Sequence, residues 1–360
     1  MKTLKCFLFA FTVAGINFSS YAQTASDTKG LKDYYKDFFT MGVAVSPASL
    51  KGDEAALILQ HYSSITPENS MKMAPIHPEE NRYNWKGADE IVEFGEKHNL
   101  KVRGHVLCWH EQAPAWFFVD DKGRDVSKEV LLQRLKDHIT TVVTRYKGRI
   151  YAWDVVNEVI ADEDDKFYRD TPWYRICGEE FIAKAFEYAH AADPQALLFY
   201  NDYNSEPRVR RDKICKLVKQ LKDNGVPIHG VGLQGHWNIY YPEEKELRDA
   251  LESYSRLGVQ VQMTELDVSI YPWEKNPRKR KEGESDKLTQ ELELRQAEFY
   301  KMAFRLLRDY KESITAVTFW NISDRKTWLD VYPVQGRKNY PLLFDVNLKP
   351  KKAYWEVVRF

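Results

Sequence analysis

Residues 149–158 read RIYAWDVVNE, an apolar run that ends abruptly in an amide and a carboxylate, Asn157 and Glu158. Tyr, Trp and Val are residue types that favour strands. In closed barrels of parallel strands, polar side chains gather at the C-terminal ends of the strands, where the apolar part of each strand has stopped. Whether this stretch belongs to such a barrel depends on how many similar runs the chain contains.

Seven other short β-rich runs occur along the chain, and longer segments with apolar residues at helical spacing separate them. The runs are FFTMGVAVS (38–46), SSIT (63–66), KVRGHVLCWH (101–110), ALLFYNDYN (196–204), IHGVGLQGHW (228–237), VQVQMTELDV (259–268) and ITAVTFWNISD (314–324). The helical segments include residues 88–100, 127–146, 179–193, 208–225, 292–310 and 350–360. Alternating strands and helices predict a parallel sheet. Eight such units predict an α/β fold with a single (β/α)8 TIM barrel.

The first 22 residues, MKTLKCFLFAFTVAGINFSSYA, have the composition of a secretory signal peptide. Two lysines precede an apolar run from Cys6 to Phe18, and small or polar residues follow it. A membrane anchor is the alternative, but the run is shorter than the roughly 20 residues that span a bilayer. We expect cleavage before Gln23, a catalytic domain over residues 23–360, and a protein that is secreted or periplasmic and has no membrane contact after cleavage.

Charge and cysteine content restrict the partners and the covalent links of the mature chain. Loss of Lys2 and Lys5 from the 53 basic residues leaves 51 against 53 acidic residues, so no nucleic acid partner is expected. The chain is expected to be a monomer. Export would allow one disulfide among Cys108, Cys177 and Cys215, and the sequence does not say which pair would form it.

Two carboxylates stand at the ends of strands that would lie nearly opposite each other in an eight-stranded barrel. Glu158 ends the fourth run and Glu265 lies near the end of the seventh. A glycosidase needs one carboxyl that keeps its proton and one that stays ionised, and burial together with mutual repulsion separates two such pKa values. Each glutamate alone is more simply interpreted as a cap or a salt-bridge partner, but their coincidence on two barrel strands favours catalysis.

Further polar residues follow the same strands. The sixth run ends in Gln234 and His236, and Asp267 lies two residues beyond Glu265, on the same side of its strand. A histidine between two carboxylates could orient Glu265 and keep it ionised.

His105, Cys108 and His110 resemble metal ligands at first sight. If the third run continues as a strand, alternation places His105 on the face opposite Cys108 and His110. No metal and no cofactor is therefore expected.

Aromatic and polar residues at the remaining strand ends suit a carbohydrate. Indole rings stack on the C–H faces of sugars, and amide, amine and imidazole groups bind hydroxyls. Trp85, Trp153 and Trp355 are interpreted as core residues instead, and the polar stretch 274–287 as a solvated loop. The candidate binding residues at the ends of the second, fifth and eighth strands are Glu68, Asn69, Lys72, Tyr203, Asn204, Trp320 and Trp328.

The order of several motifs resembles glycoside hydrolase family 10, the β-1,4-xylanases, over essentially the whole mature chain. The motifs are ENSMK, GHVLCWH with a following PAW, WDVVNE, GLQGHW, TELDV and VTFWNISDRKTWL. The resemblance implies an endo-1,4-β-xylanase that hydrolyses xylan and xylo-oligosaccharides with retention of configuration, with Glu158 as acid/base and Glu265 as nucleophile.

The same resemblance implies roles for the neighbouring residues. Asn157 would hold the 2-hydroxyl of the sugar, while His236, supported by Asp267, would bond the nucleophile beside Gln234. Tyr203 and Asn204 would contact the leaving group. The residues implied on the opposite, glycone side are Glu68, Asn69, Lys72, His105, Trp109, Trp320 and Trp328.

Three positions depart from the family pattern: Gly235 where serine is usual, Asn321 where glycine is usual, and Cys108 where valine is usual. They leave the preferred chain length open. Two alternatives remain for the activity: a retaining glycosidase of the same clan acting on another β-glycan, and an inactive barrel that only binds carbohydrate. Tolerance of side branches and the choice between periplasm and exterior are also open.

Overall fold

Eight parallel strands close into a barrel in the computed structural model, which describes residues 29–360; the expected signal peptide lies outside this range. The ring closes because the last of these strands pairs in parallel with both the first and the seventh. The strands are β1 (Thr40–Val45), β2 (Ser64–Pro67), β3 (Lys101–Gly104), β4 (Ala152–Asn157), β5 (Leu197–Asp202), β6 (Gly230–Leu233), β8 (Gln260–Ser269) and β10 (Ile314–Phe319). The predicted (β/α)8 barrel is confirmed.

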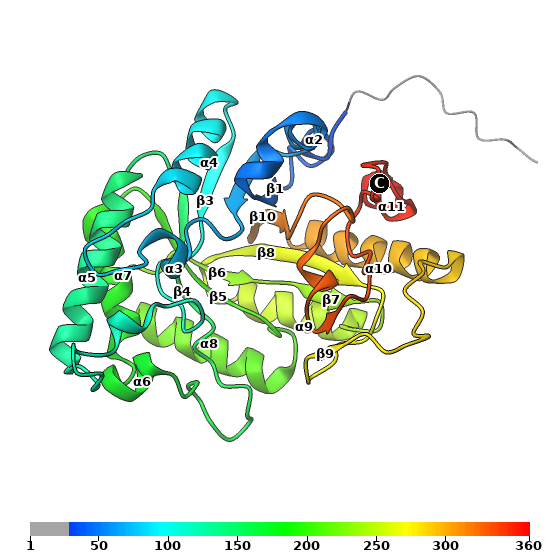
Figure 1. Cartoon of the computed structure of the whole chain (residues 1–360). Coiled ribbons are helices and arrows are strands. Elements are labelled where there is room, and N and C mark those ends of the chain that lie inside the picture. The colour runs from blue at the N-terminus through cyan, green and yellow to red at the C-terminus, as the bar shows by residue number, and fades with distance from the viewer. Residues whose placement is uncertain (1–28) are drawn as a thin grey trace, which may run out of the picture.

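Helices follow the strands and surround the barrel (Figure 1). They are α1 (Leu31–Tyr34), α2 (Gly52–His61), α3 (Met73–Ile76), α4 (Lys86–Lys97), α5 (Lys128–Arg145), α6 (Pro172–Cys177), α7 (Glu180–Ala192), α8 (Arg208–Asp223), α9 (Glu244–Ser255), α10 (Gln290–Asp309) and α11 (Lys352–Val358). The final helix α11 packs beside α10, as Figure 1 shows. No helix within residues 29–360 is long and apolar enough to cross a bilayer.

Two predicted strands are shorter in the structure than their sequences suggested. Regular β3 ends at Gly104, and residues 105–110 run beside β4 with only isolated bonds, such as Leu107 N to Asp154 O at 3.0 Å. The strand alternation that was expected to separate His105 from Cys108 and His110 is therefore wrong beyond Gly104. The sixth run divides at Gly235 into β6 and a short strand β7 (His236–Asn238), which pairs with β8.

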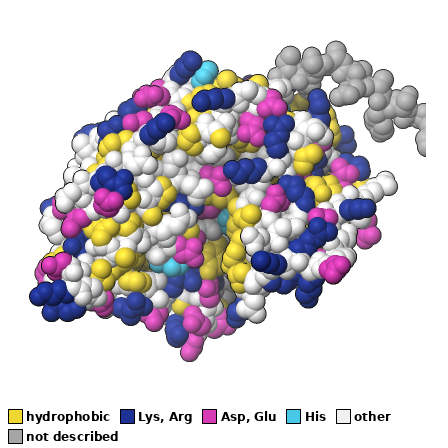
Figure 2. Space-filling model, in the orientation of Figure 1, with side chains coloured by type: hydrophobic (Ala, Val, Ile, Leu, Met, Phe, Trp, Pro, Cys, Tyr) yellow, Lys and Arg dark blue, Asp and Glu magenta, His cyan; other side chains and the backbone are white. Residues whose placement is uncertain are grey.

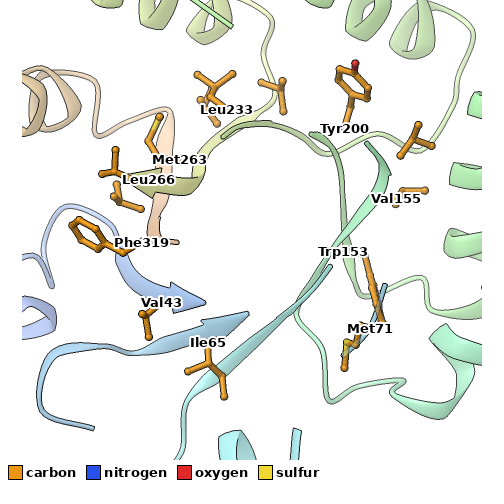
Figure 3. Packing of buried hydrophobic residues seen from close by; sticks show 14 of the residues in the cluster. Val43, Ile65, Met71, Trp153, Val155, Tyr200, Leu233, Met263, Leu266 and Phe319 are labelled. Carbon is orange, nitrogen blue, oxygen red and sulfur yellow. The ribbon is translucent and has the colours of Figure 1, made fainter. Parts of the chain in front are cut away.

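The apolar side chains of the barrel strands point outward, toward the helices. Figure 3 shows Val43, Ile65, Leu233, Met263 and Phe319 around the outside of the ring. Burial of these side chains between strands and helices provides the main hydrophobic stabilisation. At one contact between neighbouring strands only glycine fits, because a Cβ at Gly104 would lie 2.1 Å from the indole of Trp153.

The interior of the barrel is polar rather than apolar. Arg103 on β3 donates from Nη2 to Asp154 Oδ1 on β4 at 2.6 Å and from Nε to Gln262 Oε1 on β8 at 3.0 Å. Since β3 and β8 are not neighbours in the ring, the second bond crosses the interior. All three side chains are buried, so these hydrogen bonds compensate the cost of burying the charges of Arg103 and Asp154.

Replacement of Asp154 by alanine should lower the free energy of unfolding by about 3–5 kcal/mol, because Arg103 would remain charged and buried without its partner. Chemical denaturation monitored by fluorescence measures this. Glu79→Ala, which removes the exposed partner of Arg82, is the matched control and should leave stability unchanged. Similar stabilities for the two variants would contradict a structural role for the interior pair.

Three smaller expectations can be compared with the structure. Trp153 is buried and Trp85 partly buried, but Trp355 is 42% exposed because α11 turns it to the outside, so its assignment to the core was wrong. Cys108, Cys177 and Cys215 are all free.

The stretch 274–287 is largely exposed, as expected for a loop, but ion pairs hold it in place. Arg278 contacts both Glu274 and Glu284. The stretch includes strand β9 (Arg278–Lys279), which pairs with β11 (Val334–Gln335).

Candidate active site

Polar side chains from the C-terminal ends of the strands meet at one end of the barrel. The face shown in Figure 2 is hollowed near its middle, where hydrophobic, acidic and histidine side chains gather, whereas basic and acidic groups alternate over the rest of the face. One hollow adjoins Glu158, and another adjoins His236 and Asp267.

Glu158 immediately follows β4, and three side chains bond its carboxyl group. Gln234 Nε2 donates to Oε1 at 2.8 Å, Asn157 Nδ2 donates to the same oxygen at 3.0 Å, and Trp109 Nε1 donates to Oε2 at 2.9 Å. The backbone of Glu158 has a left-handed φ of 58°, a conformation that is uncommon for a residue other than glycine. The strand has thus ended, and the side chain is directed by its neighbours rather than by regular β geometry.

Glu265 lies within β8 and is also buried. Asn201 Nδ2 on β5 donates to its Oε1 at 2.8 Å, and His236 Nε2 lies 3.3 Å from its Oε2. Asn201 also donates to Asn157 Oδ1 at 2.9 Å. A chain of amides from Asn201 through Asn157 therefore connects the surroundings of the two carboxylates.

The two carboxyl groups have opposite pKa shifts. Burial raises the pKa of Glu158 to about 7. The hydrogen bond from Gln234 lowers this pKa, whereas the negative charges of Asp202 and Glu265 raise it further. Burial alone would also raise the pKa of Glu265. The hydrogen bond from His236 and the electrostatic attraction of His105 and His236 instead hold this pKa below its ordinary value. One carboxyl is thus suited to donate a proton near neutral pH while the other is ionised.

His236 is held in a protonated state between two acids. Burial alone would lower its pKa, but Asp267, whose Oδ2 lies 3.0 Å from Nδ1, and Glu265 raise the pKa to about 10. Both ring nitrogens are then donors, one to each acid. Trp328 Nε1 also donates to Asp267 Oδ2 at 2.7 Å, so Asp267 fixes the histidine and the indole together.

The predicted residues from the second strand end lie on one side of Glu158. Lys72 Nζ donates to Asn69 Oδ1 at 3.0 Å and lies 5.2 Å from the centre of the Trp109 ring. Burial lowers the pKa of Lys72, and the charges of Glu265, Glu68 and Glu158 act against this shift. Lys72 therefore belongs to the electrostatic environment of both carboxylates, with Glu68 half-buried nearby.

His105 and Trp320 form the base of the same region. His105 Nδ1 lies 2.9 Å from Asp154 Oδ2, and its ring packs edge-on against Trp320 with centroids 5.2 Å apart. Trp320 also lies edge-on to the ring of His236, with the two ring centroids 6.5 Å apart.

The two residues predicted after β5 are placed differently from each other. The Tyr203 hydroxyl donates to Asp162 at 2.7 Å and accepts from Arg169 at 2.6 Å, so its position is fixed by charged neighbours. Asn204 is exposed, with a φ of 45°. Within residues 29–360, no hydrogen bond joins Asn204 to either carboxylate.

Sequence reasoning missed Asn201, which contacts Glu265 directly. Asn201 pairs in register with Asn157 across β4 and β5, and its Oδ1 accepts from the Thr264 hydroxyl at 2.6 Å. The available signal was its place in NDYN, at the end of a barrel strand, where only the last two residues had been selected.

The three departures from the family pattern each have a structural setting. Gly235 adopts a φ of 76°, and Cys108 is buried. Asn321, where the family usually has glycine, has a φ of 110°, and its Oδ1 accepts a hydrogen bond from the backbone of Trp328 at 3.3 Å. The asparagine side chain thus helps to anchor one of the predicted sugar-binding tryptophans.

Comparison with known proteins gives full-length matches. A sequence model described as glycosyl hydrolase family 10 matches residues 30–360. The chain is 51% identical over 331 residues to a protein of Dictyoglomus thermophilum named beta-1,4-xylanase, covering 92% of this chain and 90% of the relative. It is 47% identical over 337 residues to endo-1,4-beta-xylanase B of Paenibacillus barcinonensis, covering 93% and 99%.

Solved structures agree with the sequence matches. A crystal structure of a xylanase from Paenibacillus barcinonensis superposes with a TM-score of 0.87 at 47% identity, covering 93% of this chain and 99% of that one. An endo-1,4-beta-xylanase from Caldicellulosiruptor owensensis gives a TM-score of 0.88 at 45% identity, covering 92% and 100%. With the family model matched from residue 30 to the last residue, and with relatives of this similarity over nearly their whole length, the chain belongs to glycosyl hydrolase family 10.

Proposed function

We propose that this protein is an endo-1,4-β-xylanase that hydrolyses internal bonds of xylan by a retaining double displacement. Glu158 is the acid/base and Glu265 the nucleophile. The observation that carries the assignment is the opposite pKa shift of two buried carboxyl groups at the same end of the barrel. The relatives named as xylanases support the substrate.

In the first step, Glu265 attacks the anomeric carbon while Glu158 protonates the glycosidic oxygen. The carboxylate of Glu265 forms a covalent glycosyl ester, the C–O bond to the leaving sugar breaks, and the departing oxygen takes the proton of Glu158. His236 donates to Glu265 Oε2 and Asn201 to Oε1, so both oxygens are oriented before the attack. Asn157, which is bonded to both Glu158 and Asn201, would bind the 2-hydroxyl.

In the second step, Glu158 acts as a base. Once Glu265 is an ester, its negative charge no longer raises the pKa of Glu158, so the ionised form of Glu158 is favoured. It removes a proton from water, which attacks the same carbon and releases Glu265. The net configuration at the anomeric carbon is retained.

The proposed sugar-binding surface extends on both sides of the carboxylates. On the glycone side, Lys72, Asn69, His105 and Glu68 offer hydroxyl partners, and the indoles of Trp109, Trp320 and Trp328 offer stacking faces. On the leaving-group side, the ring of Tyr203 is the contact, with Asn204 beyond it. Gln234 acts through its bond to Glu158.

Sugar release from xylan, carboxymethylcellulose and mannan tests the substrate. Xylan should be hydrolysed to short oligosaccharides, and the two other polymers should give little product. Preferred hydrolysis of mannan or the cellulose derivative would instead support the second candidate, a retaining glycosidase of the same clan with a different β-glycan. No hydrolysis of any polymer, with binding retained, would indicate an inactive carbohydrate-binding barrel.

The leader-like sequence supports a secreted or periplasmic location for a mature monomer over residues 23–360. Expression of the full chain should give a product that begins near Gln23 when the N-terminus of the exported protein is sequenced. A protein that keeps Met1 and remains with the membrane fraction would contradict this proposal.

The pH dependence of kcat/KM should follow the two carboxyl groups. The rate constant should fall as pH rises through about 7, because Glu158 then loses the proton that the leaving group needs. Asp202→Asn removes a negative charge that raises the pKa of Glu158, so this fall should begin at lower pH. Asp212→Asn, which removes an exposed charge on α8, is the matched control. Unchanged profiles for both variants would contradict the role of Asp202.

A further inference from the structure

Arg169 contacts the main chain of Glu158 from outside the barrel. Its Nε donates to the carbonyl oxygen of Glu158 at 3.1 Å, and its Nη2 donates to the carbonyl oxygen of Ile160 at 3.3 Å. The backbone nitrogen of Arg169 also donates to Val159 O at 2.8 Å. A single residue thus engages three consecutive carbonyl groups that begin at the proposed acid/base.

The position of Arg169 is itself fixed by charged and aromatic neighbours. Asp162 Oδ2 accepts from Nη1 at 2.9 Å, and the Tyr203 hydroxyl accepts from Nη2 at 2.6 Å. Asp162 is shared with the largely buried Arg210, whose Nη1 lies 2.9 Å from Oδ1. Arg210 in turn bonds Asp202 on β5 at 2.7 Å. The guanidinium of Arg169 therefore links the loop after β4 to the end of β5.

The backbone of Glu158 needs such support. Its φ of 58° is a left-handed conformation, which costs free energy for a side chain with a Cβ and persists only when the surroundings hold it. On the barrel side, Glu158 N donates to Asn201 O at 2.9 Å. On the outer side, Arg169 holds the carbonyl. A rotation of this peptide would turn the carboxyl group away from the scissile oxygen, and a misplacement of about 1 Å can cost on the order of a hundredfold in rate.

We propose that Arg169 is a positioning residue for proton transfer, acting by fixing the Glu158 carbonyl and hence the direction of its carboxyl group. This inference rests on the proposed role of Glu158 as acid/base. The side-chain hydrogen bonds of Arg169 go to backbone carbonyls, Asp162 and Tyr203, and within residues 29–360 none joins it to the carboxyl group of Glu158 or Glu265. Its effect should be confined to substrates that need protonation, whereas a residue that merely stabilises the loop would affect all substrates through the amount of folded enzyme.

Two substrates with different leaving groups separate these roles. Arg169→Met keeps much of the side-chain bulk and removes every donor. It should lower kcat/KM on xylotetraose by about ten- to a hundredfold, and on 2,4-dinitrophenyl β-xylobioside far less, because that leaving group departs without a proton. Arg169→Lys should restore part of the loss, since one ammonium cannot replace the planar fork that reaches Glu158, Asp162 and Tyr203 together.

One further variant and a stability measurement complete the test. Arg175→Met removes an exposed arginine on the nearby helix α6, which pairs with Asp170 at 3.1 Å. This variant should leave kcat/KM unchanged on both substrates. Melting temperatures of all variants give the stability contribution separately.

The outcomes distinguish this inference from the assignment of Glu158. Equal losses on both substrates, or no loss in Arg169→Met, would each overturn the positioning role while Glu158→Ala still discriminates between the substrates. Equal losses in Glu158→Ala itself would remove the acid/base assignment, and the role of Arg169 with it.

Discussion

Glu265→Ala is expected to abolish hydrolysis of xylan, with a fall in kcat of about 10⁵-fold or more. Removal of the nucleophile removes the atom that forms the covalent intermediate, and such losses are typical of reactions that depend on covalent catalysis. The side chain is buried and held by Asn201 and His236, so no other carboxylate can take its exact place. Steady-state release of reducing sugar from xylan measures the effect.

Glu206→Gln is the matched control for this variant. Glu206 is also a buried glutamate, bonded by Trp237 Nε1 at 2.9 Å, and burial raises its pKa. A neutral amide of the same shape should therefore be tolerated there, with activity close to that of the unchanged protein. Appreciable turnover by Glu265→Ala would remove Glu265 from the role of nucleophile, whatever the control shows.

Glu158→Ala should reduce hydrolysis of xylo-oligosaccharides by about 10²–10⁴-fold, the contribution usual for general acid catalysis. A sugar leaving group needs the proton, whereas a dinitrophenolate does not, so formation of the intermediate from an activated aryl glycoside should be much less affected. A burst of dinitrophenol followed by slow turnover is expected as well, because the second step loses its base. Stopped-flow measurement of both substrates shows the difference.

Gln234→Ala is a useful companion to this variant. It removes one hydrogen bond to the Glu158 carboxyl but keeps the acid, so its losses should have the same substrate dependence and be smaller. A proportional loss on both leaving groups in Glu158→Ala would contradict the assignment of the proton donor.

The barrel and the two carboxylates could be predicted from sequence because both follow from a periodic pattern. Eight β-rich runs separated by helical segments specify the topology, and Glu158 and Glu265 stand toward the ends of two of these runs. The same pattern overextended β3, since the apolar residues of HVLCWH resemble a strand although the regular pairing stops at Gly104. Apolar content predicts burial there, but not backbone geometry.

The support of the site could not be predicted in the same way. Asn201 stands at a strand end and could have been selected, but its bonds to both Asn157 and Glu265 depend on the register of β4 and β5. Arg169 lies in a loop with no periodic signal, and nothing in its sequence neighbourhood points to the carbonyl of Glu158. Such pairings depend on three-dimensional closure, which brings side chains from separate loops together.

The anomeric form of the first product tests the double displacement most directly. Proton NMR of xylotetraose hydrolysis, recorded before mutarotation proceeds, should show the β-anomer of the newly formed reducing end accumulating first. Attack by Glu265 followed by attack of water inverts the carbon twice and restores its configuration. Initial accumulation of the α-anomer would mean a single displacement by water, and would contradict the proposal that Glu265 forms a covalent intermediate.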